Sequence, residues 1–226
     1  MMDRSEVIQY LINKKNLKRY LEIGVFNGEV FFKTKARYKY AVDPAFRFVR
    51  ETKYKMMLKN SSNIKAKYFT KTSDDFFKED APSLFLKNKI DICFIDGMHE
   101  FDYVKNDVIN SLQYLDKDGV IILHDCNPLT AEAEVSYKAW EERGLTGEWN
   151  GDVWKVIVYL RSVLKDINVF TLDTDQGLGI ITWGTPEASL DFTEDQIRQF
   201  TFKDIDANRN EWLNLKRESY LLNYFG

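Results

Sequence analysis

Both histidines of the chain lie beside an aspartate where an apolar run ends. His99 follows Asp96 by three residues in "CFIDGMHEFDYVKND", and His124 directly precedes Asp125 in "GVIILHDCNP". An imidazole exchanges protons near neutral pH, so His99 is the candidate general base, with Asp96 beside it as a second catalytic residue. The alternative for His99 is a capping role at a helix that begins near Phe101.

The two aspartates also offer the oxygen ligands that a hard divalent cation such as Mg²⁺ prefers. Such an ion would lower the pKa of a bound hydroxyl, and Asn127 offers a further oxygen near Asp125. The residues leave open whether Asp96 and Asp125 hold a metal or only orient His99 and a substrate. Side chains alternate along a strand, so we expect His124 to point away from Asp125, toward a covering helix.

A second group of candidate residues lies in "YLEIGVFNG", where a short apolar run turns into a helical pattern. Glu22, Gly24 and Gly28 occupy this turn, and Asp43 follows in "AVDP", 19 residues after Gly24. Glycines let a ligand approach the backbone closely, and an acid at the end of the next strand can accept hydrogen bonds from both hydroxyls of a ribose. The pattern predicts an adenosine-type ligand, against the alternative of a loop glycine and a surface acid.

A dinucleotide site is the first rival for this turn. Its GxGxxG pattern needs glycines at positions 26 and 29, which are Phe26 and Glu29. The tight pyrophosphate loop is therefore missing, although a nicotinamide-dependent oxidoreductase stays an alternative on the same fold.

These residues need a scaffold that brings strand ends together, and the apolar periodicity predicts one. Strand-like runs alternate with helical patterns, which indicates right-handed βαβ units and a parallel sheet with helices on both faces. We expect a doubly wound, Rossmann-like α/β fold with a mostly parallel seven-stranded sheet and a C-terminal antiparallel strand pair joined by "DTDQG". Residues 1–226 should form one domain, with a helical extension from about residue 190. The expected strands are 19–24, 39–44, 64–70, 89–97, 118–125 and two within 167–184, and the expected longer helices are 3–15, 46–60, 101–115 and 152–166.

Composition narrows the class of protein. Lys and Arg total 32 against 35 Asp and Glu, a net charge of −3 without long blocks of one sign, which argues against a nucleic acid partner. Two cysteines without CxxC spacing, Cys93 and Cys126, suit a reducing cytoplasm. No apolar run approaches the ~20 residues of a membrane helix, so no membrane partner is expected.

The order of the motifs resembles the class I S-adenosylmethionine (SAM)-dependent methyltransferases. "TSDDFF", "DICFIDGMHEFDYVKND", "LDKDGVIILHDCNP" and "GDVWK" are similar to the methyltransferase-24 subgroup, whose members carry an IDGxH box and an HD box after the fourth and fifth strands. Residues from about 20 to 128 carry the likeness. Related catechol-type and macrocin-type O-methyltransferases use acids at these strand ends to hold a metal. Here Cys126 follows Asp125 in place of a further Asp or Asn.

The resemblance implies roles for individual residues. Asp43 would bind the ribose hydroxyls, and Ser73 and Asp74 the adenine edge, with helix capping as the alternative for this pair. The cofactor-binding residues that it implies are Glu22, Gly24, Asn27, Gly28, Asp43, Ser73, Asp74 and Asp96.

The stretch "GEWNGDVWK" is the candidate acceptor-binding segment. Trp149 could stack on a sugar or aromatic acceptor and Asp152 could bind one of its hydroxyls, whereas Trp154 lies in an apolar helical pattern and is better explained by core packing. The expected activity is SAM-dependent O-methylation of a hydroxyl on a saccharide or other small metabolite. A noncatalytic cofactor-binding partner is a further alternative, and association as a homodimer is left open.

Overall fold

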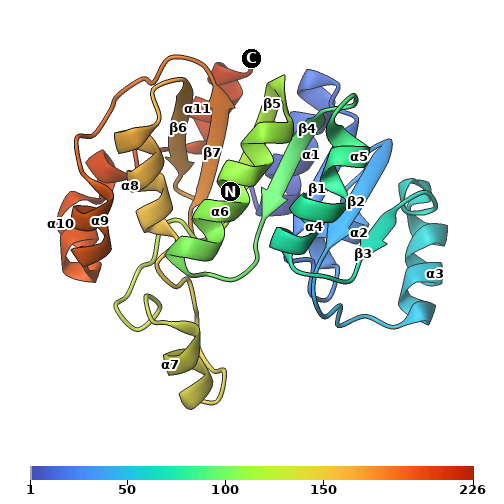
Figure 1. The fold of residues 1–226 in the computed structure, drawn as a ribbon, viewed down its shortest axis with the longest axis horizontal. Coiled ribbons are helices and arrows are strands. Elements are labelled where there is room, and N and C mark those ends of the chain that lie inside the picture. The colour runs from blue at the N-terminus through green and yellow to red at the C-terminus, as the bar shows by residue number, and fades with distance from the viewer. Residues whose placement is uncertain (1) are drawn as a thin grey trace.

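The structure is a computed structural model that describes residues 2–226, and its centre is one mixed sheet (Figure 1). The strand order is β3-β2-β1-β4-β5-β7-β6-β8. β1 pairs in parallel with β2 and β4, and β7 runs antiparallel to both β5 and β6. The strands are β1 (Arg19–Ile23), β2 (Tyr38–Val42), β3 (Lys67–Phe69), β4 (Ile90–Ile95), β5 (Leu115–Leu123), β6 (Ile167–Leu172), β7 (Leu178–Trp183) and β8 (Leu215–Lys216).

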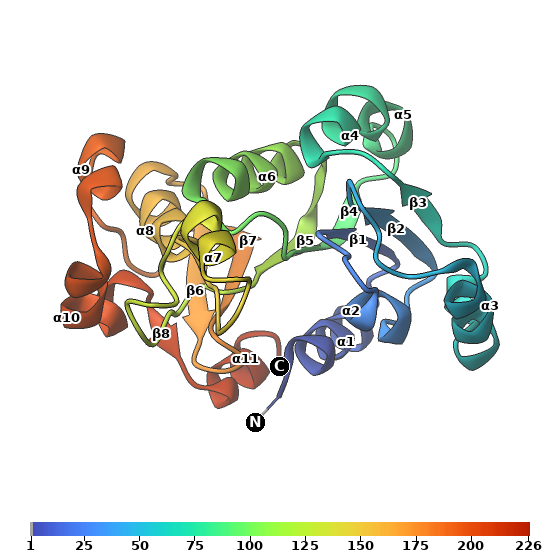
Figure 2. The same cartoon turned by 90° about the horizontal axis from the view of Figure 1, so that it is seen from below.

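Helices cover both faces of this sheet, as Figure 2 shows end-on. One face carries α4, α5, α6 and α8, and α9 and α10 lie beyond α8 at the β6–β8 end of the sheet. The other face carries α1, α2 and α11. The helices are α1 (Arg4–Lys15), α2 (Glu29–Lys33), α3 (Arg50–Lys59), α4 (Ser73–Glu79), α5 (Ala81–Phe85), α6 (Phe101–Tyr114), α7 (Tyr137–Glu142), α8 (Trp154–Val163), α9 (Glu194–Gln199), α10 (Phe202–Trp212) and α11 (Glu218–Tyr224), with a short 3-10 turn, η1 (Ser61–Asn63).

Alternation along the strands divides the interior into two cores. On β1, Leu21 and Ile23 belong to the core on the side of α4, α6 and α8, whereas Tyr20 belongs to the core on the side of α1 and α2. β4 over nearly its whole length and β5 from Gly119 onward are buried on both faces, as expected for central strands between two helical layers.

The predicted doubly wound α/β fold is confirmed, including the antiparallel β6–β7 pair and the helix at α8. The sheet has eight strands in place of the expected seven. The additional strand, β8, consists of two residues that pair in parallel with Thr171 and Leu172 of β6. A pairing this short leaves no alternating pattern in the sequence. Among residues 2–226, no helix combines the length and hydrophobicity that crossing a bilayer would require.

Candidate functional site

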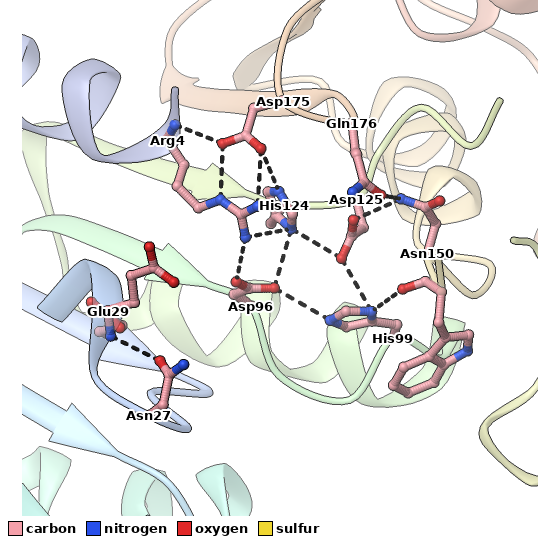
Figure 3. Close-up of polar contacts among 12 residues, drawn as sticks. Arg4, Asn27, Glu29, Asp96, His99, His124, Asp125, Asn150, Asp175 and Gln176 are labelled. Atoms are coloured by element: carbon pink, nitrogen blue, oxygen red, sulfur yellow. Dashed lines mark hydrogen bonds and ion pairs between the residues drawn. The ribbon is translucent and has the colours of Figure 1, made fainter. Parts of the chain in front are cut away.

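A cluster of charged side chains lies at the carboxyl ends of β4, β5 and β6 (Figure 3). Asp96 follows β4, Asp125 follows β5, and Asp175 lies in the turn after β6. β6 runs in the same direction as β5, because each is antiparallel to β7, so this turn reaches the same edge of the sheet. The fold thus brings together acids that lie far apart in the sequence.

His99 bridges the two aspartates that the sequence singles out. Its Nε2 lies 3.3 Å from Asp96 Oδ1, and its Nδ1 lies 3.1 Å from Asp125 Oδ2 and 2.9 Å from the Trp149 carbonyl oxygen. The N–H of Phe101, at the start of α6, instead donates to Asp152 Oδ1 at 2.6 Å. His99 therefore faces the cluster and does not cap α6.

His124 also joins this cluster, so the expectation that it points away from Asp125 is wrong. Its Nδ1 lies 3.2 Å from Asp96 Oδ1 and 2.9 Å from Asp125 Oδ2. Asp125 has a left-handed backbone conformation, with φ of +60°, so the regular alternation of side chains ends at this residue. Both side chains consequently turn toward Asp96.

Two charged residues without any assigned role in the sequence complete the cluster. Arg4, the first residue of α1, donates to Asp175 through Nε at 2.8 Å and Nη2 at 2.9 Å, and its Nη1 donates to Asp96 Oδ2 at 3.1 Å. Asp175 could have been found from the sequence, because the predicted turn "DTDQG" follows a strand that ends at the same edge of the sheet. No sequence pattern points to Arg4, since only the packing of α1 brings this residue to the cluster.

Asp125 is held from the other side by neutral groups. Asn150 Nδ2 donates to Asp125 Oδ1 at 2.6 Å and to Gln176 Oε1 at 2.7 Å. Asn150 and Asp125 are both almost completely buried. One carboxylate oxygen is thus fixed by an amide, and the other faces the two imidazoles.

The close packing of acids and imidazoles shifts the pKa values of the cluster. Burial alone would raise the pKa of Asp96, but the neighbouring His124 and His99 hold it well below its usual range. Burial would lower the pKa of His124, and Asp96 and Asp125 instead raise it well above the usual value. Burial would likewise lower the pKa of His99, but Asp96 and Asp125 outweigh this effect and raise it. The cluster therefore stabilises carboxylates next to protonated imidazoles.

Three members of the cluster have the donor set and spacing of a metal site. One ligand atom each from Asp96, His124 and Asp125 lie within 4.8 Å of one another. Two carboxylate oxygens and one imidazole nitrogen suit a divalent cation, and the nitrogen favours ions such as Mn²⁺ over Mg²⁺. The side-chain amide of Asn127, the third predicted ligand, bonds to Asp173 and Arg209.

The predicted cofactor turn lies beside this cluster at the end of β1. Gly24 has φ of +82°, and a Cβ atom there would lie 2.0 Å from the carbonyl oxygen of Asp96. Gly28, with φ of +79°, is the residue before α2, and Asn27 accepts the N–H of Glu29 at 3.0 Å. Glycine at position 24 thus allows the ends of β1 and β4 to touch.

Glu22 and Asp43, two of the acids predicted to bind the cofactor, are both buried. Asp43 accepts the backbone N–H groups of Phe26 and Ala45, each at 2.7 Å, and so fastens the β1–α2 loop to the end of β2. Glu22 accepts the hydroxyl of Tyr20, and its burial raises its pKa to about 8. In this structure Asp43 orders the loop, and Glu22 lies within the core on the α1 side.

Ser73 and Asp74 begin α4, and the cap of this helix is the preceding residue. Thr72 accepts the N–H of Asp75, so the capping alternative for Ser73 and Asp74 is not what the structure shows. Ser73 hydrogen-bonds to Asp107 of α6, whose burial raises its pKa to about 7. Neither side chain of this pair is therefore needed to cap the helix.

The aromatic segment around Trp149 supports the cluster directly. The indole of Trp149 stacks on His99 with centroids 4.6 Å apart and on Trp140 with centroids 4.8 Å apart. These contacts hold the indole against His99, while the side chain stays partly exposed, and its contact with an acceptor remains a prediction. Trp154 is fully buried, as predicted.

Comparisons with known proteins agree with this geometry. Residues 21–126 match the model of a family described as a methyltransferase domain. The fold resembles the O-methyltransferase TomG from Streptomyces achromogenes, solved in complex with SAM, with a TM-score of 0.57 and 11% identity over 80% of this chain and 79% of that one. It also resembles the O-methyltransferase from Bacillus cereus in complex with S-adenosylhomocysteine (SAH), with a TM-score of 0.56 and 11% identity over 81% and 82%. The SAH-bound methyltransferase PaMTH1 from Podospora anserina has a TM-score of 0.54 and 17% sequence identity over 81% of this chain and 80% of that one. No curated protein matches the sequence.

Proposed function

We propose that the protein is a class I methyltransferase that transfers the methyl group of SAM to a hydroxyl of a saccharide or another small metabolite. The match of residues 21–126 to a methyltransferase-domain family and the fold that the chain shares with solved O-methyltransferases support this proposal. The observation that carries the proposal is the position of His99 between Asp96 and Asp125. An imidazole there can accept the proton that an attacking hydroxyl must lose.

The proposed reaction is an in-line displacement at the methyl carbon. The acceptor oxygen forms a bond to this carbon, the carbon–sulfur bond breaks with its electron pair on sulfur, and SAH leaves. The hydroxyl proton passes to His99, whose imidazolium is stabilised by Asp96 and Asp125. Trp149 and Asn150 are positioning residues, because one stacks on His99 and the other fixes Asp125.

The cofactor is proposed to lie across the carboxyl ends of β1, β2 and β4. The glycine turn of β1 lets the ligand approach the backbone, and Asp43 would bind the ribose hydroxyls with the lone pairs that Phe26 and Ala45 leave free. The residues proposed for this site are Glu22, Gly24, Asn27, Gly28, Asp43, Ser73, Asp74 and Asp96.

A divalent cation is proposed as a second cofactor. Asp96 and Asp125, with His124 in place of Asn127, would hold it. When bound, such an ion would lower the pKa of the acceptor hydroxyl. The two buried cysteines are free thiols, which supports the cytoplasm as the proposed location.

The test measures cofactor binding and turnover separately. Calorimetry with SAH and with NADH distinguishes a methyltransferase from an oxidoreductase of similar fold. Transfer of labelled methyl groups from SAM into fractionated extract, with Mg²⁺, with Mn²⁺ and with EDTA, then reports the acceptor class and metal dependence. SAH binding without transfer to any fraction would favour a noncatalytic cofactor-binding partner.

A further inference from the structure

Helix α3 lies at the β3 end of the sheet, and none of its 10 residues is buried. Leu58 is 91% exposed, and Val49, Tyr54 and Ile64 are each more than half exposed. A helix of a folded domain normally buries one face, and a group of exposed apolar side chains marks a surface that another molecule covers. We call residues 47–67, which include these four, the α3 surface.

The α3 surface is strongly basic. Seven Lys and Arg residues stand against one acid, Glu51, a net charge of +6, whereas the rest of the chain carries −9. Within residues 2–226, none of the seven forms an ion pair with a carboxylate. Arg50 donates instead to the Tyr54 hydroxyl at 2.9 Å, and Lys53 lies 3.7 Å from the ring centroid of Tyr68. This positive charge is therefore available to an acidic partner. The seven residues are Arg47, Arg50, Lys53, Lys55, Lys59, Lys65 and Lys67.

A cavity of about 430 Å³ opens at the start of this helix. Phe48, Tyr54 and Met57 give it apolar walls, and Arg50 and Lys53 add two cations. Such a lining fits a partner segment in which apolar and acidic side chains lie next to each other.

The α7 arm, defined here as residues 128–149, has the complementary composition. Five acids stand against two cations, a net charge of −3, and all residues from 141 to 148 at its tip are exposed. The tip combines Glu141 and Glu142 with Leu145, which is half exposed. Glu142 lies 4.0 Å from Lys138, and so long and exposed a pair contributes little to stability. The arm thus offers the acids and the apolar side chain that the α3 surface lacks.

The order of the strands keeps these two surfaces apart within one chain. The α3 surface lies beside the edge strand β3, and the arm follows β5. Figure 1 shows the arm projecting below the body of the molecule and α3 at its right-hand end. A two-fold axis between them would place the arm of each copy against the α3 surface of the other, so the contact would occur twice. Twelve residues of the α3 surface and 14 of the arm are exposed, which matches the about 20–30 residues that a specific interface uses on each side.

We propose that a second copy of this chain covers the α3 surface, with the tip of each α7 arm docked at the other copy's α3. Exposed ion pairs contribute little one by one, so Leu58, Val49 and Leu145 supply the affinity and the charges set the pairing. A polyanion such as nucleic acid fits less well, because it would also meet the net charge of −9 on the rest of the chain. This dimer would form whether or not the protein transfers methyl groups.

The experiment is sedimentation velocity of the full chain at protein concentrations up to about 100 µM, where a specific interface is populated. The parent protein should dimerise in about 50 mM NaCl, and about 500 mM NaCl should weaken the dimer at least about 10-fold by screening the charges. One variant reverses the helix charges, Lys55→Glu with Lys59→Glu, and a second reverses the arm charges, Glu141→Lys with Glu142→Lys. Each alone should weaken the dimer at least about 100-fold, because like charges then meet in both contacts.

Mixing the two variants provides the decisive measurement. In a mixed pair, the acidic helix of one chain meets the basic arm of the other, and the second contact is that of the parent protein, so the dimer should return. The control, Lys87→Glu with Lys117→Glu, makes the same change of charge at exposed lysines near the starts of β4 and β5 and should dimerise like the parent.

A parent protein that stays monomeric at about 100 µM in low salt would overturn the dimer. So would full dimerisation of either reversed variant, a mixture that stays monomeric, or loss of the dimer in the control. Single-stranded oligonucleotides and phosphatidylserine vesicles are tested on the same samples. If either binds the monomeric parent and not the helix variant, the α3 surface serves a polyanion or a membrane and the proposed partner is wrong.

Discussion

Arg4 and Asp175, 171 residues apart in the sequence, form a two-pronged ion pair with N–O distances of 2.8 and 2.9 Å. The remaining Arg4 nitrogen reaches Asp96 at 3.1 Å. One side chain thus fastens the start of α1 to the turn after β6 and to the aspartate that contacts His99. Planar, paired geometry of this kind gives direction as well as energy to an arginine–carboxylate contact.

Replacing this arginine should therefore affect both stability and turnover. We expect Arg4→Met to lower the free energy of unfolding by about 1–2 kcal/mol, since the pair is partly shielded from water. Methyl transfer should fall about 10-fold because Asp96 loses a restraint. Urea unfolding and initial rates check the two effects. Lys33→Met, which removes an exposed pair with Glu29, is the control and should change stability by less than about 0.5 kcal/mol. Equal effects of the two substitutions would contradict the assigned role.

The sequence predicts the sheet and its ligand-binding edge because the responsible signals are local. Apolar runs define β4 and β5, and the strand ends place Asp96 and Asp125 at one edge whatever the details of packing. His124 could not be assigned correctly, since the left-handed backbone at Asp125 replaces the regular alternation. Arg4 could not be predicted for a different reason. Its role depends on how α1 packs against the sheet, and no local sequence pattern encodes this packing.

Trp149 illustrates a similar limit. Its place after the fifth strand, where the methyltransferases that the chain resembles recognise their acceptors, predicts ligand contact. The stacking of the ring depends instead on its three-dimensional neighbours, which here are His99 and Trp140. The aromatic composition of the segment indicates that its rings make contacts, but the sequence does not identify the partner of each ring. Residues after strand ends were predictable as a group, whereas their individual contacts required the fold.

Gly24 provides a test of the contact between the ends of β1 and β4. Gly24→Ala forces a side chain into a left-handed backbone and places its Cβ 2.0 Å from the Asp96 carbonyl oxygen. We expect a loss of more than about 3 kcal/mol in unfolding free energy and no measurable SAH binding. Gly144→Ala is the matched control: its φ is +74°, but nothing lies within 4 Å of the added atom, so it should cost about 1–2 kcal/mol. Similar losses in the two variants would show that backbone strain alone matters.

Glu22 should make stability fall as pH rises. Burial raises its pKa in the folded protein to about 8, above the ordinary value of 4.5, so the folded state binds the proton more tightly. Its contribution is complete below pH 4.5 and is lost as pH rises toward 8, with a slope of up to about 1.4 kcal/mol per pH unit. Lys39 titrates in the opposite sense only from about pH 7 upward, because burial lowers its pKa to about 7.

Urea unfolding between pH 5 and 7 reports Glu22 together with Asp107, whose pKa burial raises to about 7 and whose contribution is lost in the same direction. Glu22→Gln should reduce the slope over this window by up to about 1.4 kcal/mol per pH unit, leaving the part due to Asp107, whereas Glu29→Gln, on the exposed face of α2, should retain the full slope. Parallel stability curves for the parent protein and Glu22→Gln would contradict the assignment of the buried proton to this side chain.

His99 should control the chemical step and its pH dependence. His99→Ala is expected to lower kcat by about 10²–10⁴-fold, the usual contribution of a positioned general base, with little change in SAH affinity. Because Asp96 and Asp125 outweigh burial and raise the His99 pKa, its neutral form becomes available only above the ordinary value near 6.5. The rate of the parent enzyme should rise with pH through a midpoint above 6.5. A rate that is independent of pH from 6 to 9, or unchanged in His99→Ala, would rule out this base.

Mn²⁺ affinity distinguishes the ligand set seen in the structure, which includes His124, from the set expected from the sequence, which includes Asn127. Mn²⁺ titrated into the protein and followed by electron paramagnetic resonance should bind, and His124→Ala should weaken it at least about 10-fold by removing one of three ligands. Asn127→Ala should leave Mn²⁺ affinity unchanged, because the Asn127 amide is engaged by Asp173 and Arg209. EDTA should lower the rate of methyl transfer, and Mn²⁺ should restore it. Failure of the parent protein to bind Mn²⁺ would mean that Asp96 and Asp125 serve only to orient His99, since Arg4 and the imidazoles already provide the positive charge that these carboxylates require.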